Sequence, residues 1–420
     1  MARVHFGTDG VRGVVGRDLT PALVERLGKA AALWSGRGRV FVGRDTRGSG
    51  PELEEALARG VVAAGGSAVL GGILPTPAVA LLALDLGAVI TASHNPPQYN
   101  GVKFFDRDGR KLTDAQEEEI EALLEAAGAG GGEVDHVSVA PDSYLEHLVE
   151  RFGSDLSHLD IAVDCANGAY WEIAPKAFEQ LGARVHPLGV APDGSNINLG
   201  CGATDLRLLR ETVVAERLDF GVAFDGDGDR MLAVDAGGNE IDGDQIVAIL
   251  ALHLGVDLVA VTVMSNLGLK KLLEQHGAKV ITTPVGDRYV LEALREHGGL
   301  LGGEQSGHLI YLRGHVTGDG LAAALLLCDA VRGRTLADAA AVMPRFPQVK
   351  ENVAMPPNGL SAAAEDEVAR LNEELNGDAR VLVRASGTEP VVRLLAEAPT
   401  EAEARNLCAR IAALVTRELG

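Results

Sequence analysis

Three stretches of the chain repeat the same order of apolar and polar positions. Each opens with a short apolar run, passes a polar or glycine-containing loop, continues with helical spacing of apolar residues, and steps through a glycine into a second apolar run. They cover residues 39–70, 161–185 and 259–281. Short apolar runs that alternate with amphipathic helices are typical of α/β folds. The pattern therefore predicts three diverged copies of one α/β unit.

Two breaks in this pattern predict domain boundaries. The glycine-rich residues 128–132 end a helix expected at 113–127 and open a polar stretch that reaches Pro141. Three prolines lie within residues 346–359, before a helix that Ser361 is expected to cap. The predicted domains are three related α/β units at 1–142, 143–243 and 244–346, followed by a smaller C-terminal α+β domain at 347–420.

The net charge of the chain argues against some classes of binding partner. The formal net charge is −21 and the isoelectric point is about 4.9, whereas a nucleic acid or an anionic membrane requires a dense basic face. We therefore expect neither as a partner. If the substrate is anionic, its binding site must be a local concentration of cationic side chains.

Cysteine usage and hydropathy favour a cytoplasmic protein. The four cysteines are far apart and form no CxxC pair, as expected for core residues in a reducing compartment. The amino terminus lacks the apolar run of a signal peptide, and no apolar run approaches the ~18 residues of a membrane-spanning helix.

A glycine-spaced acidic loop is the strongest candidate for a metal site. Asp225, Asp227 and Asp229 alternate with glycine between two expected strands. Three carboxylates this close repel one another without a cation, and oxygen ligands suit Mg²⁺. A calcium loop would need glycine and glutamate where this chain has Arg230 and Ala236. The alternative interpretation is a solvated acidic turn.

Ser93 is the candidate nucleophile. It follows a strand expected at 87–91, in a polar loop that ends at Pro96. His94 is adjacent in sequence and so is expected to be badly placed as a base, and no Gly-x-Ser-x-Gly elbow is present. Alone, this loop could be an ordinary turn. Together with a metal loop, it makes Ser93 a candidate phosphoryl carrier.

Residues 384–390 could form an anion-binding loop after a strand expected at 380–383. Hydroxyl groups, a glycine and neighbouring amides can surround an anion, and Arg384 and Arg393 would add charge. A plain hairpin turn is the alternative. Neither a Walker motif nor a dinucleotide-binding glycine motif is present, which argues against a nucleotide-dependent kinase or a dehydrogenase.

Other polar loops offer groups suited to a phosphorylated sugar. Residues 302–308 contain Glu304, Ser306 and His308, a set that can bind vicinal hydroxyls. Arg12 and Lys103 lie in glycine-bearing loops and could bind phosphate. Each motif alone could equally be a structural turn or a surface cation.

In this order, the motifs resemble the α-D-phosphohexomutase superfamily over essentially the whole chain. The resemblance implies four domains around a central cleft, three of them sharing a mixed-sheet α/β core. It implies that Ser93 is phosphorylated in the active enzyme and that one Mg²⁺ per chain is bound by Asp225, Asp227 and Asp229 together with Ser93.

The resemblance also assigns roles to the remaining loops. Glu304 and Ser306 would contact sugar hydroxyls, and Arg12, Lys103 and His308 would lie near the phosphoserine, where Lys103 or His308 could move protons. The phosphate remote from the reacting end would be held by Arg384, Ser386, Gly387 and Thr388, with Arg393 nearby.

The implied reaction is phosphoryl transfer through a sugar bisphosphate. Gln305 and the opening residues 6–13 favour conversion of glucosamine 6-phosphate to glucosamine 1-phosphate, a step toward UDP-N-acetylglucosamine and cell-wall precursors, with glucosamine 1,6-bisphosphate or a similar compound as primer. Three alternatives stay open: a glucose or mannose phosphate mutase, a Mg²⁺-dependent sugar phosphatase, and a non-catalytic sugar-phosphate binding protein. The resemblance is compatible with a homodimer.

Overall fold

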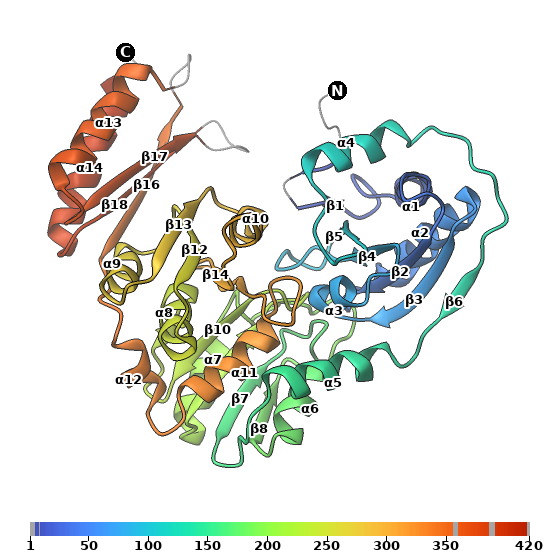
Figure 1. The fold of residues 1–420 in the computed structure, drawn as a ribbon, viewed down its shortest axis with the longest axis horizontal. Helices are drawn as coiled ribbons and strands as arrows, with labels where there is room; N and C mark the ends of the chain where they lie inside the picture. Colours follow the sequence, from blue (N-terminus) through green and yellow to red (C-terminus); the bar gives the residue numbers. More distant parts are fainter. Residues whose placement is uncertain (1–4, 8, 356–359, 386–390, 418–420) are drawn as a thin grey trace. The chain divides into compact units, whose positions relative to one another are not determined.

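The structure is a computed structural model that describes all residues except 1–4, 8, 356–359, 386–390 and 418–420. It divides into two compact units. The first contains Met1–Val263 and Ala278–Ala341, and the second contains Met264–Gly277 and Val342–Gly420. The first unit holds three sheets and the second holds one. Figure 1 shows the helices and strands of each unit.

The first sheet has six strands in the order β1-β5-β4-β2-β3-β6. Strand β2 runs parallel to β3 and β4, whereas β5 is antiparallel to β4. Helices α1 and α2 pack against each other over a core of aliphatic side chains. The elements are β1 Val11–Val14, α1 Pro21–Trp34, β2 Arg39–Arg44, α2 Gly50–Ala64, β3 Ser67–Ile73, α3 Thr76–Leu81, β4 Leu86–Ile90, β5 Tyr99–Asp106, α4 Asp114–Ala122 and β6 Val134–His136.

The second sheet has the order β11-β10-β9-β7-β8 and the third β13-β12-β14-β15. The strands of the second sheet and its helices are α5 Ala140–Phe152, β7 Asp160–Asp164, α6 Ile173–Gln180, β8 Arg184–Leu188, α7 Arg207–Glu216, β9 Phe220–Phe224, β10 Met231–Asp235 and β11 Glu240–Ile241. The third contains α8 Gly243–Leu254, β12 Leu258–Thr262, β13 Lys279–Thr283, α10 Asp287–His297, β14 Leu301–Gly303, β15 Leu309–Tyr311, α11 Gly320–Ala330 and α12 Leu336–Ala340.

The three sheets share one topology, which confirms the predicted repeat. In each, a central strand lies between two parallel neighbours, and a fourth strand returns antiparallel to the third. The equivalent sets are β3-β2-β4-β5, β8-β7-β9-β10 and β13-β12-β14-β15. Strands β4, β9 and β12 are buried throughout, as expected for strands covered on both faces.

The second unit is a three-stranded antiparallel sheet of order β16-β18-β17, with helices against one face. Its apolar core includes Leu371 of α13 and Cys408 of α14. Ser361 accepts a hydrogen bond from the Ala364 amide and caps α13, as predicted. The elements are β16 Gln348–Ala354, α13 Ala362–Leu375, β17 Arg380–Ala385, β18 Val391–Glu397 and α14 Glu401–Arg417.

The expected helix of the third repeat belongs to the second unit. Helix α9, Leu267–Gln275, lies in the segment Met264–Gly277, which is bonded to the small sheet. The Leu267 amide donates to Glu397, and Arg380 donates to the Ser265 carbonyl. These long-range bonds decide which unit the helix joins, and its local pattern carries no information about them.

Three local expectations were wrong. Arg12 and Lys103 were expected in loops, but they lie on strands β1 and β5. The helix expected at 113–127 is α4, Asp114–Ala122, which Thr113 caps and Leu123 ends. The polar stretch after residue 132 contains a strand, because β6 pairs in parallel with β3 at the edge of the first sheet. Edge strands need little apolar sequence, since their side chains face solvent, and all three residues of β6 are exposed.

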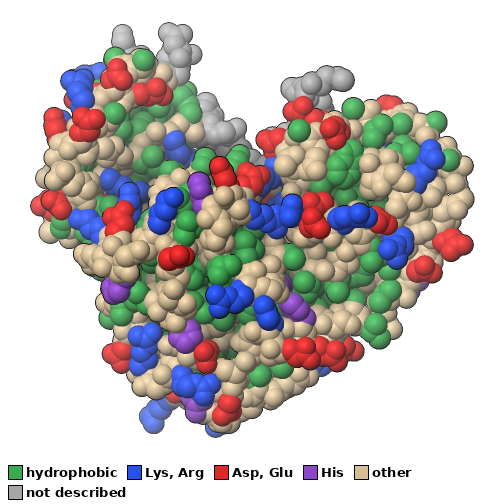
Figure 2. All heavy atoms as spheres, viewed as in Figure 1, with side chains coloured by type: hydrophobic (Ala, Val, Ile, Leu, Met, Phe, Trp, Pro, Cys, Tyr) green, Lys and Arg blue, Asp and Glu red, His purple; other side chains and the backbone are tan. Residues whose placement is uncertain are grey.

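The four cysteines are free and buried, as predicted. The apolar stretch 321–328 lies within α11, which is almost entirely buried against other elements. Among the described residues, no helix is long and apolar enough to span a membrane. On the face shown in Figure 2, acidic and basic side chains lie intermixed with apolar ones.

Candidate active site

Three of the predicted motifs occupy the same position in the repeat, the loop between the third strand and the antiparallel strand. Ser93 lies in the β4–β5 loop, the three aspartates lie in the β9–β10 loop, and His308 lies in the β14–β15 loop. The Ser93 hydroxyl donates to Asp225 Oδ2 at 2.6 Å. Arg230 and His308 form a backbone bridge. The structure therefore brings the three loops together.

Ser93 is held in an unusual backbone conformation. Its φ is +51°, in the left-handed region that non-glycine residues rarely adopt, and the residue is 2% exposed. Its amide donates to the Thr91 hydroxyl at 2.9 Å. Its carbonyl accepts bonds from Arg47 and Asn198. Such strain persists only where neighbouring contacts enforce it.

Arg47 supplies one of those contacts, and it was not among the predicted site residues. Its guanidinium donates to four backbone carbonyls, those of Ser93, Asn95 and Pro96 in the loop and that of Tyr99 at the start of β5. The Asp45 carboxylate, 2.9 Å from the Arg47 Nε atom, balances the buried charge. The Asp-Thr-Arg sequence directly after β2 was the available signal, but nothing in it identifies the distant carbonyls.

His94 lies closer to Ser93, the candidate nucleophile, than expected. Its Nδ1 atom is 3.4 Å from the Ser93 hydroxyl, although sequence adjacency suggested that the imidazole would be badly placed. We attribute this to the left-handed backbone at Ser93. Burial, together with the charges of Arg230 and Arg12, lowers the pKa of His94 to about 4. The imidazole is therefore neutral at neutral pH.

The acidic loop has the geometry of a cation site. One carboxylate oxygen from each of Asp225, Asp227 and Asp229 lies within 4.8 Å of the others, and all three residues are buried. Burial and the charges of its two neighbours raise the pKa of Asp225 well above its usual value. In the described part of the chain, Asp227 Oδ1 is buried without a hydrogen-bond partner. An unpaired buried carboxylate oxygen and an all-oxygen donor set fit a hard divalent cation.

Lys103 lies between acidic groups. Its ammonium is 3.0 Å from Asp9, 3.1 Å from Asp227 and 3.5 Å from Asp229. Burial lowers the pKa of Lys103, but these carboxylates outweigh burial and raise it above its usual value. Arg12 pairs with Asp9 in the same cluster. Lys103 is thus a permanent positive charge beside the aspartate loop.

His308 also borders the aspartate loop. Its Nε2 atom is 3.3 Å from Asp287 and its Nδ1 atom is 3.7 Å from Asp229. Burial alone would lower the pKa of His308, but the two carboxylates raise it. The imidazole is therefore placed to hold a proton at the edge of the site.

The two predicted sugar-binding residues lie in the same loop as His308 but are less buried. Glu304 is half-buried, and its Oε1 atom accepts the Gly286 amide at 3.0 Å. Ser306 is exposed. Both residues are thus close to His308 in the sequence, and the Ser306 hydroxyl is accessible.

The predicted phosphate-binding residues belong to the second unit. Arg384 of β17 and Arg393 of β18 are directly opposite in the register. With Lys350 and Asn352 of β16 they line a pocket of about 340 Å³. Like charges directly opposite on adjacent strands destabilise a sheet, so this group favours an anion. Ser386, Gly387 and Thr388 lie outside the described residues.

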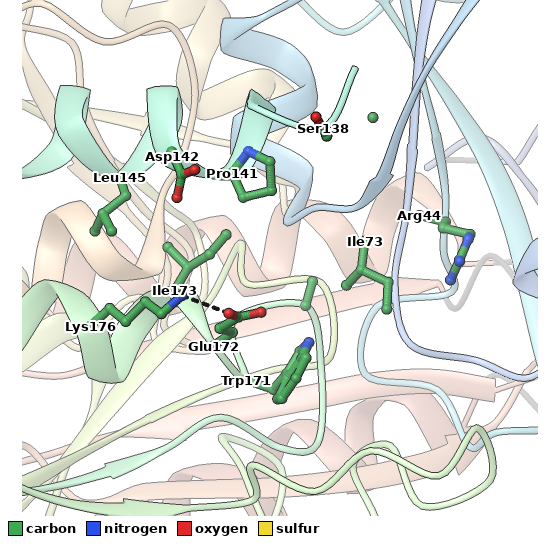
Figure 3. A pocket seen from close by; sticks show the side chains of 12 residues that line it. Arg44, Ile73, Ser138, Pro141, Asp142, Leu145, Trp171, Glu172, Ile173 and Lys176 are labelled. Atoms are coloured by element: carbon green, nitrogen blue, oxygen red, sulfur yellow. Dashed lines mark hydrogen bonds and ion pairs between the residues drawn. The ribbon is translucent and has the colours of Figure 1, made fainter. Parts of the chain in front are cut away.

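A larger pocket of about 480 Å³ contains none of the predicted site residues. Figure 3 shows Arg44 at one end, Glu172 and Lys176 at the other, and Trp171 with Ile73 between them. Lys176 is 2.6 Å from Glu172. Lys176 and Glu172 are therefore paired with each other.

Comparison with known proteins extends the likeness over the whole chain. Four family models of phosphoglucomutase/phosphomannomutase match, the alpha/beta/alpha domains I, II and III at residues 3–130, 142–238 and 242–346 and the C-terminal domain at 336–414.

Curated relatives are similar over nearly their full length. The phosphoglucosamine mutase of Moorella thermoacetica is 48% identical, over 96% of this chain and 97% of the relative. That of Thermobifida fusca is 47% identical, over 99% and 98%.

Solved structures are also similar over nearly the whole chain. A phosphoglucomutase/phosphomannomutase family protein from Burkholderia thailandensis is 26% identical with a TM-score of 0.83, covering 99% of this chain and 96% of the other. A putative phosphomannomutase from Thermus thermophilus is 28% identical with a TM-score of 0.80, covering 99% of both. The chain belongs to the phosphoglucomutase/phosphomannomutase family, within the α-D-phosphohexomutases.

Proposed function

We propose that the chain interconverts glucosamine 6-phosphate and glucosamine 1-phosphate, the activity of a phosphoglucosamine mutase. The observation that carries the chemistry is the contact of the Ser93 hydroxyl with Asp225, at the edge of three buried carboxylates. The substrate follows from the curated relatives, which are phosphoglucosamine mutases at 43–48% identity. The product would supply UDP-N-acetylglucosamine and cell-wall precursor synthesis.

The proposed cofactor is one Mg²⁺ per chain, held by Asp225, Asp227 and Asp229 with an oxygen of phosphorylated Ser93. When bound, the ion neutralises charge on the transferring phosphoryl group. The buried, unpaired Asp227 oxygen and the raised pKa of Asp225 support this assignment. Lys103 adds a fixed positive charge on the other side of Asp227.

In the proposed reaction, phosphorylated Ser93 gives its phosphoryl group to the free hydroxyl of glucosamine 6-phosphate. The bond between Ser93 Oγ and phosphorus breaks, a sugar oxygen–phosphorus bond forms, and the sugar hydroxyl releases its proton. The resulting glucosamine 1,6-bisphosphate reorients, and its other phosphate returns to Ser93. Because the enzyme ends phosphorylated, the net reaction is an isomerisation, and a bisphosphate of this kind would prime unmodified Ser93.

The other predicted residues have proposed roles in this cycle. Arg12 is proposed to stabilise the phosphoserine, and His308 or Lys103 to move protons. The raised pKa of Lys103 favours His308 for that role. Sugar hydroxyls are proposed to bind Glu304 and Ser306. The unreacting phosphate is proposed to bind Arg384, Ser386, Gly387, Thr388 and Arg393.

Further proposals concern organisation. We infer four domains at 1–142, 143–243, 244–346 and 347–420, a cytoplasmic enzyme, and a homodimer as its assembly. Size-exclusion chromatography with light scattering would give the mass in solution, and a monomer at working concentrations would exclude the dimer.

The direct test is interconversion of glucosamine 6-phosphate and glucosamine 1-phosphate with Mg²⁺ and a bisphosphate primer, beside glucose and mannose phosphates. Preference for the amino sugar supports the proposal, and preference for glucose or mannose phosphates refutes the substrate. Release of free phosphate without an isomer would identify a phosphatase. Ligand binding without turnover, with Ser93 unmodified, would identify a binding protein.

A further inference from the structure

A buried polar cluster lies directly behind the aspartate loop, residues 225–230. Asp319, 2% exposed, is its centre. Asp319 Oδ1 accepts the Tyr170 hydroxyl at 2.8 Å, and Oδ2 accepts the Tyr144 hydroxyl at 2.5 Å. His315 Nε2 lies 3.0 Å from Oδ2. It costs free energy to assemble a buried carboxylate with several donors. We therefore expect the cluster to serve stability or function.

Tyr170 forms one wall of the aspartate loop. Its ring centroid lies 4.9 Å from that of Phe224, the last residue of β9. A Cβ atom added to Gly228 would lie only 2.4 Å from Tyr170 Cε2. Gly228 stands between Asp227 and Asp229, and its φ is +77°. The ring therefore packs against the loop at the residue that joins two of the carboxylates.

The start of α11 also contacts the aspartate loop. The Gly320 amide donates to the Gly228 carbonyl at 3.0 Å. A Cβ atom on Gly320 would lie 2.6 Å from the Arg230 carbonyl oxygen, so the helix start also touches the end of the loop. Asp319 caps this helix by accepting the Ala322 amide at 2.9 Å. One carboxylate thus binds both the helix and the tyrosine that enclose Gly228.

The segment that carries Tyr170 is bonded to the aspartate loop through its backbone. The Ala169 amide donates to the Gly226 carbonyl at 2.9 Å, which is a second direct bond to the aspartate loop. Trp171, the next residue, lines the pocket of about 480 Å³ in Figure 3. Tyr170 itself is buried. The backbone therefore presents Tyr170 to the aspartate loop and Trp171 to the pocket.

We propose that Tyr170 and Asp319 are positioning residues for the aspartate loop. Their hydrogen bond holds the tyrosine ring and the start of α11 against Gly228, and so fixes the spacing of Asp227 and Asp229. Groups that orient metal ligands from outside the coordination sphere set metal affinity as well as geometry. The inference rests on the divalent-cation site of the proposed function and adds residues that touch neither the ion nor the substrate.

Tyr144 provides a matched control. Its hydroxyl donates to the same carboxylate and lies 2.7 Å from the Tyr170 hydroxyl, so Tyr144→Phe removes the same kind of buried hydrogen bond as Tyr170→Phe. The ring of Tyr144 is nearly parallel to that of Tyr170, with centroids 6.5 Å apart, whereas the three atoms nearest to a Cβ on Gly228 all belong to Tyr170. A purely structural cluster predicts equal effects of the two variants on every measurement, whereas a positioning role predicts different effects on metal binding.

The experiment is calorimetric titration of the metal-free full-length protein with Mn²⁺, together with thermal unfolding of each variant. We expect Tyr170→Phe to raise the Kd for Mn²⁺ about 10-fold and Tyr144→Phe to raise it by less than about 3-fold, while both lower the unfolding midpoint by similar amounts. Mutase assays should show a raised half-saturating Mg²⁺ concentration for Tyr170→Phe and a kcat at saturating Mg²⁺ close to wild type.

An unchanged Kd in Tyr170→Phe, or equal increases in both variants, would overturn the positioning role. If wild-type protein itself binds no Mn²⁺, the proposed metal site fails, and the inference fails with it. If Tyr170→Phe does not fold, Asp319→Asn replaces it, because an amide keeps the shape but loses one acceptor. The same increase in Kd is then expected, and a wild-type Kd would again overturn the proposal.

Discussion

The side chains of Ser93 and Asp225 meet at 2.6 Å, although 132 residues separate them in the chain. The contact joins the proposed nucleophile of one repeat to the aspartate loop of the next. We expect Ser93→Ala to lower mutase activity by more than about 1,000-fold, because it removes the hydroxyl that is proposed to carry the phosphoryl group. Kinetic assays would measure the loss, and mass spectrometry would locate the phosphate in the wild type. Undiminished activity would end the phosphoserine role.

Metal binding and stability should respond in opposite directions to Asp225→Asn. The folded state disfavours a charge at Asp225, because burial and its two neighbours raise the pKa. Removing that charge should stabilise the metal-free protein by on the order of 1 kcal/mol and abolish the stabilisation that Mg²⁺ gives the wild type.

Thermal unfolding with and without Mg²⁺ checks both parts, and EDTA should abolish wild-type activity until Mg²⁺ is restored. If Mg²⁺ still stabilises Asp225→Asn, the ion binds elsewhere. The exposed Asp108→Asn is the matched control, and it should behave as wild type in both measurements.

Arg47→Met should destabilise the protein and slow the reaction. It leaves the Asp45 carboxylate buried without its cation and removes the Arg47 donors from four backbone carbonyls. Breaking a buried ion pair from one side costs about 3–5 kcal/mol. Urea unfolding would measure this cost, and kcat should fall because Ser93 loses its constraint.

The control for Arg47 is Arg39→Met, since Arg39 is exposed at the start of β2, the strand that precedes Arg47. The double variant Asp45→Asn/Arg47→Met should recover part of the stability without recovering kcat. Recovery of both quantities would mean that Arg47 serves stability alone.

Arg384→Met should weaken substrate binding. A hydrogen bond to a charged group contributes about 1.5–3 kcal/mol, so KM for glucosamine 6-phosphate should rise by about 10- to 100-fold. Steady-state kinetics, with inorganic phosphate as a competitor, would measure the change. Arg405→Met is the matched control, because Arg405 is exposed on α14 and pairs with Glu401. An unchanged KM would contradict the proposal that Arg384 binds the substrate phosphate.

The sequence by itself determined the elements, the repeat and the chemistry of the loops. Hydrophobic period and capping residues act over a few positions, and so strands such as Phe220–Phe224 and the cap at Ser361 were predictable. The aspartate loop could be identified from the sequence because its three carboxylates are close together in the chain. The family resemblance added roles to Ser93 and Lys103 that residue patterns alone left open.

Only the tertiary structure decided which distant groups meet. It assigned α9 to the second unit and β6 to a sheet edge, and it brought Arg47 to four carbonyls more than forty residues away. It also joined Tyr170 to Asp319 across 149 positions. Such contacts depend on how buried surfaces of different elements fit together, whereas a local pattern fixes only which face of an element is buried.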